Sequence, residues 1–234
     1  KTGLSVTLLT AKDIEPFLGG TLADLLTNQV GIHINGAQSH HGSELSYFIR
    51  GGNNRQVLVL IDGVPVSDPT QIENDFDLRT IDLSSIESVE IIRGAASSLY
   101  GSAAATAVIK ITTNRPKQQS LGGSIRTIYG SNNDKLDFSL APNVQTRQLQ
   151  LVTGNATHAS SISFSDQRTM GMSSVIGTED DSTAKQNLSA QYQLQLSSDF
   201  RLNAFFTKDY FSSEYDDSFP ALMDADNYFT SKSQ

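Results

Sequence analysis

The residues with the most evident capacity for chemistry are acidic and gather near the C-terminal end of the sequence. Residues 179–226 include ten acidic side chains against three basic ones, and most of the acids fall in two loops, 177–182 and 214–226. If strands run over 185–196 and 200–214, both loops emerge on the same side of the sheet. The sequence therefore predicts two carboxylate-rich loops that lie side by side.

Carboxylates brought together in this way repel one another unless a cation binds between them or the loops stay far apart. Calcium suits such loops, because it takes about six to eight oxygen ligands from flexible segments and tolerates irregular geometry. The alternative is that the acids are solvated surface residues, which keep this face of the protein soluble. The charge pattern alone leaves both interpretations open.

A second polar loop, Gly36–Ser43, contains the adjacent histidines His40 and His41, which could contact haem or a metal chelate or simply be solvated. Enzyme motifs are missing: there is no His-Glu-x-x-His spacing, no Gly-x-Ser-x-Gly elbow and no phosphate-binding glycine loop. Residues 75–77 begin like a calcium loop, but Arg79 and the residue after it stand where a further ligand and a glycine are required. The sequence therefore predicts a protein that is not an enzyme.

Composition narrows the class of protein further. The 234 residues carry a formal net charge of −8, which argues against a nucleic-acid binder, because such proteins need basic surface. The absence of cysteine excludes disulfides, thiolate zinc sites and cysteine nucleophiles. The most apolar run, 57–61, is far shorter than the roughly 18 residues of a transmembrane helix. A membrane β-barrel stays open, because its strands give only a weak alternating signal.

The elements that position these residues differ between the two halves of the chain. Up to Gln119, short apolar segments alternate with helix signals, which is typical of a small α/β sheet. Helix starts are predicted at Thr10 and Thr21, because a threonine three residues before an acid can cap a helix. Strands are predicted at 5–9, 31–34, 47–50, 57–61, 88–93 and 107–112, with a turn at Asp62-Gly63.

After Gln119 the chain changes to long segments that alternate between apolar and polar residues. The clearest is 187–196, which a tight turn joins to the alternating segment 201–210. Further strands are predicted at 123–129, 136–140, 149–151 and 160–165, and a last one begins at Tyr228. Segments of about ten residues with short turns on one side and longer loops on the other are typical of outer-membrane barrels. A soluble antiparallel sandwich alternates equally well, so this half alone fits both architectures.

Several blocks of the first half resemble a known domain. They are Phe48–Gly51, Val57–Val66, Ile86–Gly94, Ala95–Gly101 and Ala107–Thr113, preceded by Leu25-Leu26 and Val30–Ile34. In this order and spacing they resemble the plug domain of TonB-dependent outer-membrane receptors over about residues 4–117. The sequence departs from that pattern at Ala95, which replaces the usual proline, and at 102–107, where alanines replace glycines. Alanine narrows the allowed backbone conformations, so this turn is expected to be stiffer.

The resemblance implies an α/β plug domain with a small mixed sheet in residues 1–119. It implies that residues 120–234 form the first antiparallel strands of a transmembrane β-barrel. A barrel of about 22 strands encloses a lumen wide enough to leak, which the plug fills. Such a barrel needs on the order of 440 residues. The remaining strands are therefore expected after Gln234, and the segment that docks to TonB before Lys1.

The function that the resemblance implies is active import of a scarce, bulky ligand across the outer membrane of a Gram-negative bacterium. The expected partners are TonB in the periplasm, outer-membrane lipid, the ligand and a surface-exposed accessory lipoprotein. In the family, arginines such as Arg50 and Arg93 pair with glutamates of the barrel and hold the plug in place. The alternative for these two residues is a solvated arginine at the end of a strand.

Within the family the sequence is most similar to the cobalamin (vitamin B12) receptors, through the short loop before Phe48, the Asn53-Asn54 step and the acidic barrel loops. Those receptors present plug loops like 36–46 and 67–76 to the ligand, and they bind calcium in acidic loops. The substrate-binding residues implied here are Gln38, Ser39, His40, His41, Ser43, Ser67 and Asp68. The implied calcium ligands are Asp180, Asp181, Asp216, Asp217, Asp224 and Asp226.

Other readings of function remain open at this point. Siderophores, haem and oligosaccharides are alternative ligands, because receptors for all of them share the plug domain. A different class altogether is a soluble two-domain binding or adhesion module whose second half is a sandwich. The two classes differ in what is expected after Gln234: further alternating segments that end in an aromatic residue would support the receptor, whereas a stop codon there would exclude it.

Overall fold

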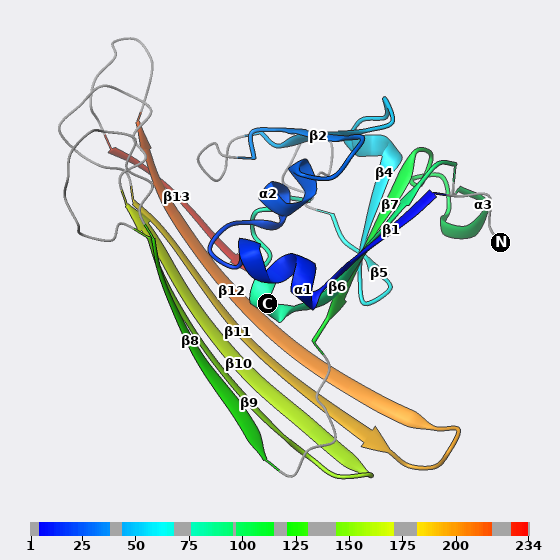
Figure 1. Ribbon diagram of the computed structural model, residues 1–234, viewed down its shortest axis with the longest axis vertical. Coiled ribbons are helices and arrows are strands. Elements are labelled where there is room, and N and C mark those ends of the chain that lie inside the picture. Colours follow the sequence, from blue (N-terminus) through cyan, green and yellow to red (C-terminus); the bar gives the residue numbers. More distant parts are fainter. Residues whose placement is uncertain are drawn as a thin grey trace. The chain divides into compact units, whose positions relative to one another are not determined.

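The computed structural model describes residues 5–37, 44–67, 76–95, 97–114, 121–130, 144–170, 182–216 and 226–233 (Figure 1). The chain divides into two compact units, one up to Asn114 and one mainly after it. The predicted domain boundary after Gln119 falls in a segment outside the described residues and stays a prediction. No helix in the described ranges is long and apolar enough to cross a membrane.

A five-stranded mixed sheet is the centre of the first unit, as predicted. Its strands are β1 (Ser5–Thr10), β4 (Val57–Ile61), β5 (Val64–Pro65), β6 (Ile86–Arg93) and β7 (Ala107–Thr113). They lie in the order β1-β6-β7-β4-β5, with β4 and β7 parallel and the other neighbours antiparallel. The inner strand β4 is a continuous apolar run, as suits a strand covered on both faces, whereas the inner strands β6 and β7 carry the partly buried Glu90 and Lys110 among their apolar residues.

Short helices flank this sheet. They are α1 (Ala11–Ile14), α2 (Leu22–Thr27) and α3 (Ser97–Tyr100), with 3-10 turns at Glu15–Phe17, Asn54–Gln56 and Leu83–Ser85. Both predicted helix starts are confirmed. The backbone N–H of Thr10 donates to Asp13 at 2.8 Å, and that of Thr21 donates to Asp24 at 2.9 Å. Figure 1 shows α1, α2 and the hairpin of β2 (Ile32–Asn35) and β3 (Ser46–Ile49) on one side of the sheet.

Two tight turns connect strands of the first unit through residues with positive φ. Arg50 (φ 50°) and Gly51 (φ 81°) turn the chain after β3, and Asp62 (φ 50°) and Gly63 (φ 86°) turn it after β4. Positive φ at both central residues is the type I′ geometry that fits the twist of paired strands. The predicted turn at Asp62-Gly63 is confirmed. The predicted strand 47–50 is one residue too long, because Arg50 lies in the turn.

The second unit is a single antiparallel sheet of six strands that follow one another in sequence. They are β8 (Gly122–Gly130), β9 (Val144–Gly154), β10 (His158–Met170), β11 (Ser182–Gln195), β12 (Arg201–Asp216) and β13 (Asp226–Ser233). Short turns join β9 to β10 and β11 to β12, while the longer connections lie at the opposite strand ends. The predicted strand at 136–140 lies outside the described residues.

The two faces of this sheet have opposite character. One face carries apolar side chains that are exposed, and neighbours across the strands pair Ile162 with Leu151 and Phe164 with Leu188. The other face is polar: the hydroxyls of Ser163 and Ser189, for example, share a 2.6 Å hydrogen bond. A sandwich would bury its apolar face against a second sheet, and the described residues of this unit form only one. An exposed apolar face opposite a polar face is the pattern of a membrane barrel wall and agrees with the predicted barrel strands rather than with a sandwich.

Candidate functional site

The predicted substrate-binding residues fall in two loops of the sequence, 38–43 and 68–75, that lie outside the described residues. Gln38, Ser39, His40, His41, Ser43 and Asp68 are therefore not placed, whereas Ser67 is exposed after β5. The described residues that flank the two segments are here called the loop roots. They are Gly36–Ala37 and Glu44–Leu45 for the first loop, and Val66–Ser67 and Phe76–Asp77 for the second.

Arg79 contacts a root of each loop from a buried position. Its side chain is only 1% exposed, and its Nε and Nη2 atoms donate to the two carboxylate oxygens of Asp77, each at 2.9 Å. Its Nη1 atom donates to the carbonyl oxygen of Gly36 at 3.0 Å. A single side chain therefore connects the end of the second loop to the start of the first.

Asn54 holds the other root of the first loop in a similar way. The buried Asn54 side chain donates from Nδ2 to the carbonyl oxygen of Leu45 at 2.9 Å, and its Oδ1 accepts the backbone N–H of Tyr47 at 2.6 Å. A side-chain amide that donates to one backbone carbonyl and accepts from a nearby backbone N–H makes the same pair of hydrogen bonds that a neighbouring strand would make. The start of β3 is thereby fixed where the loop ends.

Sequence reasoning did not identify Arg79 or Asn54 as site residues. Arg79 entered only as a departure from a calcium loop, and Asn54 only as part of a resemblance. An Asp-x-Arg pair such as Asp77 and Arg79 carries no signal of burial, because most such pairs are solvated. The signal lies in position, because Asp77 and Arg79 follow directly after the loop 68–75, which the sequence had already singled out.

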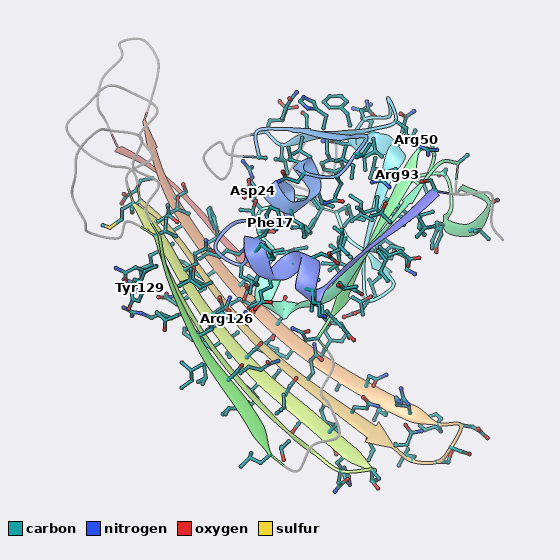
Figure 2. The ribbon with its side chains drawn as sticks, viewed as in Figure 1. Phe17, Asp24, Arg50, Arg93, Arg126 and Tyr129 are labelled. Carbon is teal, nitrogen blue, oxygen red and sulfur yellow. The ribbon has the colours of Figure 1, made fainter. Side chains whose placement is uncertain are left out.

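Arg50 and Arg93 form the second part of the candidate site (Figure 2). Arg93 ends β6, is 7% exposed, and donates from Nη1 to the Thr7 hydroxyl at 2.6 Å, while its Nε atom is buried without a partner. Burial, and then the nearby positive charge of Arg50, lower the pKa of Arg93 below its ordinary value. Arginine nevertheless stays charged in proteins.

No ion pair among the described residues involves either of these arginines. A buried cation next to a second cation is costly unless an anion compensates it. The pairing of Arg50 and Arg93 with barrel glutamates stays a prediction.

The predicted calcium ligands are placed only in part. Asp180, Asp181, Asp217 and Asp224 lie outside the described residues, and Asp216 and Asp226 are cross-strand neighbours where β12 meets β13. At the same sheet end, the Glu214 carboxylate accepts the backbone N–H of Ser182 at 2.9 Å. The ends of the two acidic loops thus lie side by side, as predicted. Among the described residues, no group of three or more acidic or histidine side chains is placed to hold a metal ion.

Comparisons with known proteins bear on both units. Residues 1–108 match the family model described as the TonB-dependent receptor plug domain. The chain is 37% identical over 141 residues to the vitamin B12 transporter BtuB of Vibrio cholerae serotype O1, an alignment that covers 59% of this chain and 22% of the transporter. The chain therefore spans about a fifth of the length of that relative.

Solved structures resemble the fold of nearly the whole chain. The siderophore receptor PirA from Acinetobacter baumannii superimposes with a TM-score of 0.70 at 17% identity, covering 90% of this chain and 32% of PirA. The pyoverdine receptor FpvA from Pseudomonas aeruginosa gives a TM-score of 0.72 at 14% identity, covering 91% of this chain and 28% of FpvA. At these identities the likeness concerns the fold alone. These named matches are receptors and transporters rather than enzymes, in agreement with the prediction from the sequence.

Proposed function

We propose that this chain, whose residues 1–108 match the TonB-dependent receptor plug domain, is part of a receptor of the Gram-negative outer membrane, and that the whole protein actively imports cobalamin across that membrane. The observation that carries the choice of ligand is the 37% identity to a vitamin B12 transporter over 141 residues. The siderophore receptors share only the fold at 17% identity or less, so they favour no particular ligand.

Each unit supports a separate part of this function. The exposed apolar face of the six-stranded sheet suits contact with lipid, and its polar face suits a wet lumen. The first unit has its own sheet and core, as a domain needs if it is to fill that lumen and still change shape. In the proposed cycle, cobalamin binds at the external loops of plug and barrel. TonB then pulls on the plug with energy from the inner-membrane proton gradient.

The ligand is tested by equilibrium binding to the purified full-length receptor. We expect saturable binding of cyanocobalamin and none of ferric siderophores or haem. Ser67→Trp adds bulk at an exposed loop root and should weaken binding, whereas Val30→Trp, exposed before β2, is a matched control that should not. Exclusive binding of a siderophore would overturn the cobalamin proposal, and recovery of the protein in the soluble fraction would overturn the receptor proposal.

We further propose that calcium orders the two acidic loops before the ligand binds. The support is chemical and topological: carboxylate oxygens are ligands that calcium prefers, and the ends of both loops meet at one end of the sheet. Asp180, Asp181, Asp216, Asp217, Asp224 and Asp226 are the residues proposed to supply these oxygens. A bound cation would also remove the repulsion between the loops.

Calcium dependence is measured as cobalamin affinity in millimolar calcium and in chelator. We expect calcium to tighten binding on the order of tenfold, which is within the usual range for coupled sites. The double variant Asp181→Ala with Asp216→Ala should bind equally in both conditions. Asp199→Ala removes an exposed acid from the short turn at the opposite end of β11 and β12, so it should keep the calcium effect. Equal affinity of the wild-type receptor in both conditions would contradict the proposal.

A further inference from the structure

Arg79 is the largest of the fully buried side chains in the described chain, and it is a charged one. Taking a guanidinium out of water is costly, and the cost is offset only when its donors are well paired. Here Nε and Nη2 are paired with one carboxylate and Nη1 with a backbone carbonyl, all within 3.0 Å. The backbone N–H of Arg79 also donates to Asp77 Oδ1 at 2.8 Å.

These contacts join segments that are far apart in sequence. Asp77 ends the second loop, and Gly36, which begins the first, lies 43 residues before Arg79. The hydroxyl of Thr80 donates to the Asp77 carbonyl oxygen at 2.7 Å, so the segment that carries the carboxylate is itself held. One root of each loop, at Gly36 and at Asp77, is therefore held by one hydrogen-bonded group, which we call the arginine clamp (Arg79, Asp77 and the Gly36 carbonyl).

Stability alone does not account for an arginine at this position. Buried ion pairs can often be replaced by apolar residues of similar volume with little loss of stability. What an apolar side chain cannot supply is direction, because only a planar guanidinium holds a carboxylate on one edge and a carbonyl on the other. The arrangement therefore specifies where Gly36 lies relative to Asp77.

We propose that Arg79 is a positioning residue for ligand binding, which holds the roots of the two ligand loops in the geometry that binds. The role rests on the proposed function, in which the segments 38–43 and 68–75 meet the ligand. Without the clamp, the two loop roots adopt several arrangements, and only one of these arrangements binds the ligand. The apparent Kd rises by the inverse of the fraction of molecules that keep it.

The test uses the full-length receptor with Arg79→Met, Arg79→Lys and a control, Ile109→Ala. Ile109 is buried in β7, and its truncation destabilises the plug core without touching the clamp. Spin labels at Ala37 and at the exposed Glu87 on β6 report the distance from the first loop root to the sheet. Cobalamin affinity is measured on the unlabelled variants.

We expect Arg79→Met to broaden the distance distribution between the labels and to raise the Kd for cobalamin about tenfold or more. Arg79→Lys keeps the charge but loses the forked geometry, so it should resemble Arg79→Met. Ile109→Ala should keep both the wild-type distance distribution and the wild-type Kd. A wild-type distribution and Kd in Arg79→Met, or the same changes in Ile109→Ala, would overturn the proposal. If the wild-type receptor binds no cobalamin, the proposed function fails, while the label distances still decide whether the clamp holds the loop root.

Discussion

Gly52→Ala is expected to destabilise the plug domain strongly. A Cβ atom at this buried glycine would lie 2.2 Å from Oγ1 and 2.4 Å from Cγ2 of Thr106. Neither residue can move away easily. Gly52 exchanges two backbone hydrogen bonds of 3.0 Å with Ile49, and Thr106 donates from its backbone N–H and its hydroxyl to the carbonyl oxygen of Gln56. Overpacking of this kind costs about 3 kcal/mol or more, a large part of the stability of a domain.

The measurement is hydrogen exchange of the β6 and β7 amides in the full-length receptor. Gly51→Asn is the matched control, because a Cβ at Gly51 meets nothing within 4 Å and asparagine tolerates positive φ. That variant should exchange much like the wild type. Adding Thr106→Ala to Gly52→Ala removes the two nearest atoms and should recover part of the protection. Wild-type exchange in Gly52→Ala would show that the two segments can separate, contrary to the structure.

Arg93→Met is expected to loosen the plug in the full-length receptor by about 3–5 kcal/mol, the cost of leaving one partner of a buried ion pair alone. The reason is the environment of Arg93: it is 7% exposed and lies near Arg50, and its Nε donor has no partner among the described residues. If a barrel carboxylate satisfies that donor, removal of the guanidinium leaves the carboxylate buried and unpaired. Exchange of the β6 amides should then accelerate at least about a hundredfold.

Lys12→Met tests whether the loss of any positive charge has this effect. Lys12 is exposed on α1, so its removal should change exchange by less than twofold. The outcome that contradicts the ion pair is a gain in protection in Arg93→Met. In that case removal of a poorly paired buried cation would have stabilised the plug, and no barrel carboxylate would compensate it.

The elements that sequence reasoning predicted well are those whose pattern and local chemistry agree. The apolar run 57–61 is β4, and the capping threonines Thr10 and Thr21 begin their helices as expected. The alternating segments after Gln119 predicted the strands of the second unit. Successive side chains of a strand point to opposite faces, so any sheet with one apolar and one polar face shows apolar residues at every second position. The choice between sandwich and barrel needed the structure, since both architectures impose the same period.

The candidate site could be predicted less well, for a physical reason. Strand and helix patterns depend on neighbours in sequence, whereas Arg79 contacts a carbonyl 43 residues away. Arg50 shows a related difficulty: arginine is not a residue type that marks a positive φ, and Arg50 adopts its φ of 50° in the tight turn between the paired residues Ile49 and Gly52. The roles of the two arginines and of the acidic loops come from a resemblance and stay predictions.

The order of strands in the first unit has a consequence for the rate at which this unit folds. β1 precedes the other described strands of the unit in sequence, but its partner is β6, so the pairing of Ser5 with Arg93 closes a loop that contains most of the unit. β4 likewise waits for β7, because Val57 pairs with Ala107. In the second unit, by contrast, each of the strands β9 to β13 pairs with the strand that precedes it in sequence. Contacts that close long loops form slowly. Among the described strands of the first unit, β1, with its exposed apolar Val6 and Leu8, therefore closes the longest loop when it pairs, and we expect it to join the sheet last.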